Sequence, residues 1–463
     1  MTPPPAKPEL LLPAGSPEKR RVAIAYGADA IYMGLPMASL RTPSRGEQFT
    51  PANLPPEIAD TQAQGVKAYI TLNIFAANHD LKRLIPHLEA MEAARPDAFI
   101  ISDPGIFRLA RKHAPGVPIH ISTQANTLNR EAAAFWQDLG ATRVILAREM
   151  PLREIAETHA ALPDLELETF VHGSLCVAYS GRCVISDYLT DNTKNSNKGM
   201  CGNSCRWEFE QAEGHGLQSG AQPSQALPGM AMNEVTRPGE TYTFEEDQHG
   251  SYMLNSRDLC LVAHLKTLAE AGVCSFKVEG RTKSLYYVAT AGQVYREAID
   301  AFAAGDASDD RIRAWTARLA RAGNRGFTEG FLNGRPDHTA INYQTSKTRQ
   351  ESVFLATALE YDARTQRVQI QARNPVTAGD TVTAMLPGPA ATHSATFALD
   401  KIQDDHGLPL SDLQTNQTGW IALPETLRPQ LSEHWSYLML SADAMPAQPP
   451  SVSSAPKAMP LAV

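Results

Sequence analysis

A repeated alternation of short apolar runs with helical stretches dominates the chain between residues 9 and about 300. Each run is rich in β-branched residues, which favour strands, and a segment with helical periodicity follows it. The runs begin at residues 9, 29, 66, 97, 118, 143, 165 and 274. Eight such units in succession predict an α/β fold, a (β/α)8 TIM-like barrel, over residues 8–325. An open doubly wound sheet is the alternative that the pattern allows.

The first helix shows its ends in the sequence. Ser16 is placed to cap the helix, Pro17 occupies its first position, and Gly27 is placed to end it.

One unit of the predicted barrel is oversized. Roughly 100 residues separate the seventh run from the eighth, far more than a barrel loop needs. We therefore predict an insertion over residues 172–255, which opens with a cysteine-rich stretch. Residues 211–241 are polar and rich in Gly and Pro, which indicates a long loop, and residues 242–259 predict a hairpin with its turn at His249-Gly250.

The residue pattern changes after residue 345. Apolar and polar residues alternate, with turn signals between the alternating stretches, which predicts a small C-terminal antiparallel β-barrel domain over residues 346–445. Residues 446–463 are low in complexity and predict a disordered tail.

The composition restricts location and partners. The formal net charge is −8, which excludes a generic polycation but still allows a local basic patch. The chain starts without the apolar core of a signal peptide, and no apolar run is as long as a membrane span. We therefore expect a cytoplasmic protein, in which clustered cysteines more often bind metal or do redox chemistry than form disulfides.

Polar side chains gather where the predicted strands end. Barrel enzymes place their chemistry at the carboxyl ends of the strands, so we expect a site there. The candidates are His120, Ser122, Gln124, Asn126, Arg148, Glu149, Glu168, His172, Lys277, Glu279, Arg281 and Lys283. Taken one at a time, such a residue is more often capped or solvated, but four strand ends together favour a site.

The stretch "VEGRTKS" allows two interpretations. Gly280 can let the backbone turn tightly while Arg281 and Lys283 present an anion-binding fork. Alternatively, the stretch is a plain turn into a helix, with Glu279 and Arg281 paired on the surface.

Four of the six cysteines fall between residues 176 and 205. Six residues separate Cys176 from Cys183, seventeen separate Cys183 from Cys201, and three separate Cys201 from Cys205. A 4Fe–4S cluster tolerates such irregular spacing. Zinc held by four thiolates is the alternative, although zinc pairs are usually closer in sequence. Cys260 and Cys274 lie beside apolar segments, where buried core cysteine is the expected role.

One basic segment could contact RNA phosphates. Residues 311–326 contain no acid and, at helical spacing, Arg311, Arg318 and Arg325 share a face while Trp315 and Leu319 point inward. Arg313 and Arg321 add further charge. A solvated helix packed on the barrel is the alternative interpretation.

Three long motifs carry a resemblance to a known family. They are "ETFVHGSLCVAYSGRCVIS", "GMCGNSCRWEF" and "SFKVEGRTKSLYYVATAGQVYREAID". They resemble the collagenase-like peptidase family of unassigned catalytic type, number 32, over roughly residues 8–445. Within the family the chain is most similar to the branch that acts in tRNA 5-hydroxyuridine formation.

The resemblance implies oxygen-independent hydroxylation of the wobble uridine of tRNA, with prephenate as a possible co-substrate. It implies an iron–sulfur cluster on Cys176, Cys183, Cys201 and Cys205, with Cys260 as an alternative to Cys205. On this interpretation Arg281 and Lys283, with Arg148 and Lys277, hold a small carboxylate metabolite or a phosphate. Proton transfer then falls to side chains around the reacting ring, namely Glu168, His172, His120, Gln124 and Glu279.

The family name suggests peptidase activity as the rival function. The sequence contains neither a His-Glu-x-x-His zinc motif nor a Gly-x-Ser-x-Gly elbow. His172 precedes Cys176 closely, but a thiol that binds a cluster is not a free nucleophile. An RNA-binding accessory protein is the third alternative.

Overall fold

The computed structural model describes residues 7–40, 47–185, 201, 205, 230–233, 241–244, 246–247, 250–251, 255–342 and 348–444. No helix among them is long and apolar enough to cross a membrane. The predicted cluster ligands Cys201 and Cys205 are described without their neighbours, and the predicted tail lies outside the described residues.

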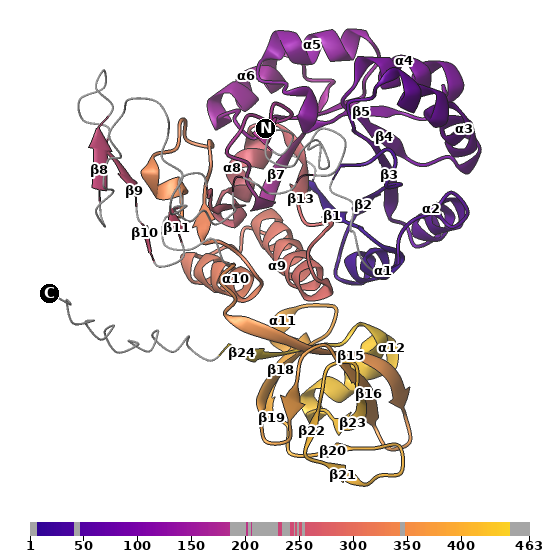
Figure 1. Cartoon of the computed structure of the whole chain (residues 1–463), viewed down its shortest axis with the longest axis vertical. Coiled ribbons are helices and arrows are strands. Elements are labelled where there is room, and N and C mark those ends of the chain that lie inside the picture. The colour runs from indigo at the N-terminus through magenta and orange to yellow at the C-terminus, as the bar shows by residue number, and fades with distance from the viewer. Residues whose placement is uncertain are drawn as a thin grey trace, which may run out of the picture.

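The predicted barrel is confirmed (Figure 1). Its parallel strands are β1 (Glu9–Pro13), β2 (Ala30–Met33), β3 (Lys67–Leu72), β4 (Ala98–Ile101), β5 (Ile119–Ile121), β6 (Arg143–Ile145), β7 (Glu166–Ser174) and β13 (Val273–Val278). Strand β13 pairs with β1 on one side and with β7 on the other, so the sheet closes on itself. This closure excludes the open doubly wound sheet.

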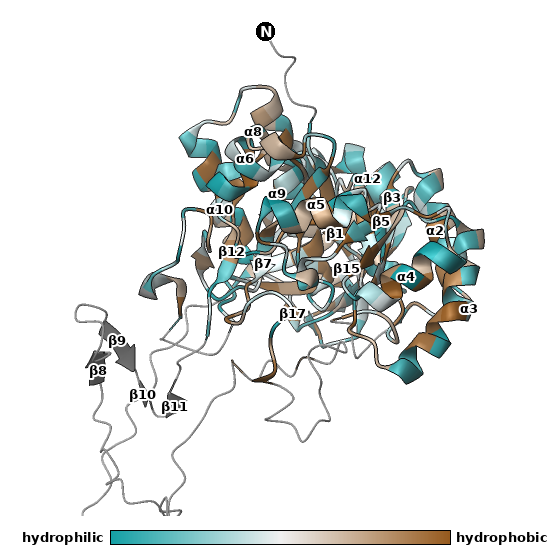
Figure 2. Cartoon of the chain, turned by 90° about the horizontal axis from the view of Figure 1, so that it is seen from above, coloured by the Kyte–Doolittle hydropathy of each residue, from teal (hydrophilic) through white to brown (hydrophobic). Residues whose placement is uncertain are grey.

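Helices surround the strands and cover the outside of the barrel. They are α1 (Pro17–Ala25), α2 (Leu54–Ala63), α3 (Asn78–Ala94), α4 (Pro104–His113), α5 (Arg130–Asp138), α6 (Leu152–Ala161), α8 (Leu265–Glu270) and α9 (Leu285–Ala303). Figure 2 shows helices such as α3 and α4 hydrophobic along one side and hydrophilic along the other. In α4 the buried side consists of Ile106, Phe107 and Ala110. Burial of such apolar stripes against the strands holds the helices in place.

The predicted ends of the first helix are also confirmed. The Ser16 hydroxyl accepts a hydrogen bond from the Lys19 amide at 3.2 Å, and Pro17 is the first helical residue. Gly27 follows the helix with a φ of +100°, a conformation that side chains with a Cβ rarely adopt.

The insertion between β7 and β13 returns to the barrel through β12 (Asp258–Cys260), which pairs antiparallel with β7. The predicted hairpin is present as β10 (Glu246–Asp247) and β11 (Gly250–Ser251), so Gly250 belongs to a strand and not to the turn. A second antiparallel pair joins β8 (Met230–Asn233) to β9 (Thr241–Phe244). Strand β8 lies in the stretch that we expected to be loop, whereas most of β9 lies in the stretch predicted as a hairpin. Strand β8 could not be predicted, because it is short and follows a segment rich in Gly and Pro, which indicates loop.

The predicted antiparallel β domain is present at the C-terminus, where its strands form a curled sheet. Its strands are β15 (Ser352–Asp362), β16 (Arg367–Ala372), β18 (Thr381–Met385), β19 (Ser394–Ala398), β20 (Ile402–Gln403), β21 (Pro409–Leu410), β23 (Thr418–Ala422) and β24 (Met439–Asp443). Short elements complete this part: β17 (Val376–Thr377), β22 (Asp412–Leu413), α11 (Ala390–His393) and α12 (Arg428–His434).

The sheet docks on the barrel beside α9 and α10 (Asp309–Arg321), as Figure 1 shows. The Tyr26 hydroxyl donates to the Met385 carbonyl at 3.0 Å, and the Gln293 amide donates to the Leu386 carbonyl at 3.0 Å. The ring of Phe354 stacks on that of Tyr286, and Met385 and Met439 also join the apolar core of the barrel, so the two parts share an apolar interface.

Candidate functional site

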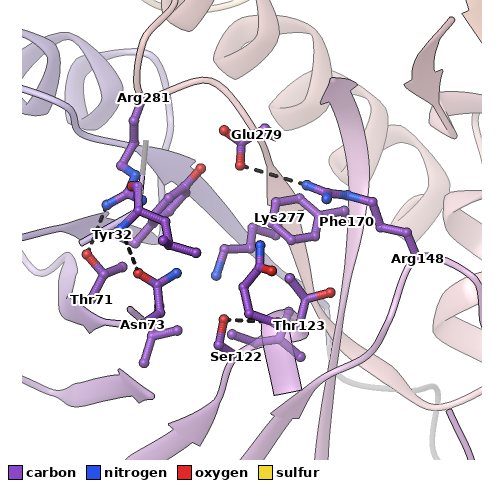
Figure 3. A pocket seen from close by; sticks show the side chains of 14 residues that line it. Tyr32, Thr71, Asn73, Ser122, Thr123, Arg148, Phe170, Lys277, Glu279 and Arg281 are labelled. Atoms are coloured by element: carbon purple, nitrogen blue, oxygen red, sulfur yellow. Dashed lines mark hydrogen bonds and ion pairs between the residues drawn. The ribbon is translucent and has the colours of Figure 1, made fainter. Parts of the chain in front are cut away.

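A polar pocket lies at the carboxyl ends of the barrel strands (Figure 3). The cavity has a volume of about 400 Å³ including its mouth. Side chains from most of the strands line it, namely Tyr32, Leu40, Thr71, Asn73, Ile100, Ser122, Thr123, Gln124, Ile145, Arg148, Phe170, Lys277, Glu279 and Arg281. Its place at the carboxyl ends of the strands is the one expected of a small-molecule site in a barrel.

Several predicted site residues meet in this pocket. Gln124, Arg148, Lys277, Glu279 and Arg281 all line it, although they come from three separate stretches of sequence. The expectation that strand ends converge around one mouth is therefore correct for these side chains.

Arg281 lies inside the pocket wall, where only 5% of the residue is exposed. Its guanidinium donates to the Thr71 hydroxyl at 2.9 Å and also to the Leu40 carbonyl. The Tyr32 ring lies 5.3 Å from the guanidinium carbon. A surface pair between Arg281 and Glu279 is therefore excluded, and the arginine is held rigidly at the pocket edge.

Glu279 pairs instead with Arg148 across the mouth. The two side chains are 11% and 5% exposed, and Arg148 Nη2 lies 3.8 Å from Glu279 Oε2. The Arg148 guanidinium also covers the Phe170 ring at 4.0 Å. These contacts orient both charged groups toward the same cavity (Figure 3).

Lys277 forms the floor of the pocket, and Glu168 lies beneath it. Lys277 Nζ donates to Glu168 Oε1 at 2.8 Å, and neither side chain is more than 5% exposed. Glu168 therefore lies beneath the pocket and does not line it. Burial lowers the pKa of the Lys277 ammonium group, while the Glu168 carboxylate opposes this shift.

A network of buried charges continues from Glu168 toward the amino-terminal end of the barrel. Arg143 Nη1 donates to Glu168 Oε2 at 3.0 Å and to Glu9 Oε1 at 2.7 Å, and its Nε donates to Glu166. Burial acts to raise the pKa of Glu9, but Arg143, Lys67 and Tyr69 together outweigh it and the pKa is lowered. The network explains how a barrel interior can hold so many charges, because each one is paired.

His120 lies inside the barrel below the pocket, and its ring meets the Tyr69 ring edge-on at 4.8 Å. Burial, together with Arg143 and Lys277, lowers its pKa far below the usual range, so the ring is neutral. The prediction that His120 faces the pocket is therefore wrong. Strand β5 ends only after His120, which places its side chain in the interior layer of the barrel.

His172 lies on the outer side of β7. Between β7 and β13 the register shifts, so that Lys277 pairs with Phe170 but Val278 pairs with His172. This irregularity turns His172 away from the pocket and against the rings of Tyr287, Tyr295 and Phe327. Burial lowers its pKa to about 3. The prediction that His172 lies in the pocket, beside the reacting group, is thus wrong.

Lys283 also lies apart from the pocket. The chain enters α9 at this point, capped by Ser284, and Lys283 Nζ donates to the Gly323 carbonyl at 3.0 Å. The predicted fork of Arg281 and Lys283 therefore divides, with Arg281 in the pocket and Lys283 outside it.

The loop that carries Cys176 and Cys183 is docked on the rim of the pocket. The Ser180 amide donates to Glu149 Oε1 at 2.9 Å, and the Asn126 amide group donates to the Ser180 carbonyl at 2.9 Å. Gly181 approaches so closely that a Cβ there would lie 2.0 Å from the Gln124 carbonyl oxygen. The loop therefore rests against a residue that lines the cavity.

All four cysteines of the motif are half-buried. Thiol sulfurs are the donors that an iron–sulfur cluster requires, so the donor chemistry fits. Within the described ranges, however, no three His, Cys, Asp or Glu side chains are grouped to hold a metal ion.

The remaining two cysteines belong to the barrel. Cys274 lies in β13 and Cys260 is the last residue of β12. Burial raises the pKa of each thiol to about 11. Such thiols are poor ligands and nucleophiles, which agrees with a core role.

The predicted basic face of residues 311–326 is not a free patch. Helix α10 ends at Arg321, so Arg325 does not extend its face. Every one of the arginines meets a carboxylate: Arg311 meets Asp306, Arg313 meets Asp310, Arg318 meets Glu297, Arg321 meets Asp443 and Arg325 meets Asp258. The segment lacks acids, but neighbouring turns and elements supply them. Trp315 and Leu319 are buried as predicted.

Sequence reasoning missed some pocket residues. Tyr32, Thr71 and Asn73 line the cavity. Asn73 follows β3, so the same rule that selected Gln124 could have found it. The Tyr32 and Thr71 side chains left no comparable signal, because both lie within apolar strand runs.

The sequence also matches the model of peptidase family U32 over residues 15–342. The chain belongs to that family. One relative, the tRNA hydroxylation protein P of Escherichia coli, is 38% identical and covers 91% of this chain and 95% of its own length. The protein of the same name from Haemophilus influenzae is 42% identical, over 82% of this chain and 86% of its own. A collagenase from Porphyromonas gingivalis is 29% identical, over 77% of this chain and 81% of its own.

Proposed function

We propose that this member of family U32 modifies tRNA by hydroxylating the wobble uridine to 5-hydroxyuridine without molecular oxygen. The observation that carries the reaction class is the similarity, along nearly the whole chain, to proteins named for tRNA hydroxylation. The restriction to the wobble uridine, a prephenate-linked mechanism and an iron–sulfur cluster are parts of the proposal that rest on the sequence motifs.

The pocket supports a reaction on a small polar group. It gathers the cations of Lys277, Arg148 and Arg281 against the carboxylate of Glu279, with Glu168 below. Counting one charge for each, three positive charges face two negative ones. This excess suits a singly charged carboxylate such as that of a co-substrate.

We assign the roles of the chain's own residues as follows. Arg281 and Arg148 hold the carboxylate, since both guanidinium groups border the cavity and are fixed by neighbours. Gln124 supplies an amide beside the cysteine loop, and Glu279 is the pocket carboxylate placed to exchange a proton with a bound group. The reacting uracil or the co-substrate lies between this wall and the loop.

An iron–sulfur cluster would be held by Cys176, Cys183, Cys201 and Cys205, and would supply one-electron transfer. The contacts of Ser180 with Glu149 and Asn126 keep the first pair at the pocket rim. Anaerobic purification with iron and sulfide analysis tests this part. Replacing any one of the four cysteines by Ala should remove most iron, whereas Cys274→Ala should retain it, and stoichiometric zinc in a colourless protein would refute the cluster.

The names of some relatives keep proteolysis as a second candidate. A cysteine peptidase needs an accessible base beside its thiol. His172 is the histidine near the motif, but its ring is enclosed by aromatic side chains and burial keeps it neutral. The geometry therefore argues against a cysteine peptidase that uses His172 as its base.

One paired experiment separates the alternatives. Purified protein is assayed on collagen peptides, while tRNA nucleosides are analysed from cells that lack the protein. Loss of 5-hydroxyuridine derivatives without peptide cleavage supports the proposal. Peptide cleavage with unchanged tRNA would favour the peptidase. Unchanged tRNA without any peptide cleavage would favour an accessory role.

A further inference from the structure

The pocket floor holds an amine in surroundings that make it reactive. Lys277 is 4% exposed and lies between the rings of Tyr32 and Phe170, whose centroids are 4.6 and 5.5 Å from Nζ. Figure 3 shows the side chain in the middle of the lining residues. An amine in such a place is shielded from bulk water yet borders the cavity.

The charges around Lys277 also affect the reactivity of its amine. Burial lowers the pKa of Lys277, and the nearby Arg281 lowers it further, against the opposing effect of Glu168. A lysine that is desolvated and adjacent to another cation carries a larger fraction of neutral, nucleophilic amine than a surface lysine does.

Glu168 gives this amine a partner for proton transfer. Its Oε1 accepts from Lys277 Nζ at 2.8 Å, while its Oε2 is held by Arg143 at 3.0 Å. A proton can move across the shorter contact without changing the net charge of the buried network. The carboxylate can thus take a proton from Lys277 and return it later.

The wall opposite Lys277 is suited to a carboxylate. Arg281 and Arg148 place two guanidinium groups at the cavity edge. The Asn73 Oδ1 atom accepts a hydrogen bond from the Leu40 amide at 3.1 Å, which turns the Asn73 amide nitrogen toward the cavity (Figure 3). An amine and a carboxylate-binding wall in one small cavity together select a molecule with an acid group next to a carbonyl.

We propose that Lys277 is a nucleophile that captures a small 2-oxo acid as an imine, with the acid group held by Arg281 and Arg148. The inference rests on the proposed function only in treating this pocket as the reaction site. It adds a covalent step and a chemical class of ligand to that site.

The step balances without any oxidant or reductant. The Lys277 ammonium gives one proton to Glu168, the Nζ–carbon bond forms, and the carbonyl π bond breaks. The oxygen becomes a hydroxyl by taking one of the two protons left on nitrogen. Glu168 then returns its proton to the hydroxyl, water leaves, and a protonated carbon–nitrogen double bond remains. Such an iminium withdraws electrons from the neighbouring carbon and so activates the bound acid.

Reductive trapping tests the inference on the purified full-length protein without tRNA. The protein is incubated with pyruvate, the smallest 2-oxo acid, and sodium cyanoborohydride, and modified residues are located by peptide mass spectrometry. We expect a stable adduct on Lys277. Lactate, which lacks the carbonyl, should give none, and Lys277→Arg should abolish the adduct while keeping the positive charge.

The exposed lysines Lys82, Lys112 and Lys401 act as internal controls within the same sample. An adduct spread evenly over these lysines, or none on Lys277 in the folded wild-type protein, would overturn the inference. Glu168→Gln should slow trapping at Lys277 and leave the controls unchanged, whereas an unchanged rate would remove Glu168 from the step. Because the assay needs no tRNA, an adduct on Lys277 with normal tRNA in cells lacking the protein would refute only the proposed function.

Discussion

Lys277 Nζ and Glu168 Oε1 lie 2.8 Å apart beneath the pocket, and their side chains are 5% and 0% exposed. The contact joins the lining of the cavity to the charged interior of the barrel, since Glu168 also binds Arg143. Two functions meet in one ion pair: it stabilises the barrel and it sets the state of the amine in the pocket.

Removing the Glu168 charge should therefore be costly. Glu168→Gln leaves Lys277 and Arg143 without a carboxylate that both contact, and breaking a buried pair typically costs about 3–5 kcal/mol of unfolding free energy. Urea unfolding measures the loss. The control Glu157→Gln breaks the exposed pair with Arg153 and should cost about 1 kcal/mol or less. Equal losses in the two variants would show that the buried pair does not stabilise the fold.

The cysteine loop should loosen when its anchor is weakened. Glu149→Gln removes the charge that accepts the Ser180 amide hydrogen bond, so residues 176–185 should exchange amide hydrogens faster while the barrel strands remain protected. Hydrogen exchange with mass spectrometry measures this. Glu131→Gln, on the exposed surface of α5, is the control. Unchanged exchange in the loop would mean that other contacts hold it.

His172 should make stability depend on pH. Its pKa is lowered from 6.5 to about 3, so the unfolded chain binds a proton that the folded chain does not. The free energy of unfolding should therefore fall as the pH drops from about 6.5 toward about 3, and be insensitive to this group above that range. His172→Phe keeps an aromatic ring but removes the titration.

Urea unfolding of the wild type and His172→Phe at pH 7 and pH 5 checks this expectation. The wild type should lose more stability than the variant between the two values. The same loss in both would place the pH dependence elsewhere and would remove the evidence for a neutral, enclosed ring.

Helix α10 should contribute to domain docking more than to RNA binding. Arg318 binds Glu297 at 2.5 Å, and Arg321 binds Asp443 of the C-terminal sheet at 2.7 Å. Arg321→Ala should lower the melting temperature and leave the tRNA affinity of the folded protein and its salt dependence unchanged. Arg364→Ala, in an exposed turn of the C-terminal sheet, is the control for stability. A reduced salt dependence of tRNA binding for Arg321→Ala would indicate instead that Arg321 contacts tRNA phosphates.

Much of the fold could be read from the sequence, because the strand and helix periods of a barrel repeat along the chain. Gln124, Lys277 and Arg281 could be predicted as site residues from their places at or near strand ends. His172 could not be placed, because the register shift that turns it outward depends on pairing between two distant strands. The ion partners of Arg318 and Arg321 come from other elements, so a local count of charges gave the wrong impression of a free patch.

The level of 5-hydroxyuridine derivatives in tRNA tests the central claim most directly. Cells lacking the protein are complemented with the wild type, with Arg281→Lys, or with Arg153→Lys, a control at a side chain that is 81% exposed. Arg281→Lys keeps the charge but loses the planar fork that binds Thr71 and borders the pocket. We predict that the wild type and Arg153→Lys restore the modification, and that Arg281→Lys fails to do so with its iron content and melting temperature intact. Failure of the wild type to restore the modification would contradict tRNA hydroxylation, and full restoration by Arg281→Lys would contradict the pocket as its site.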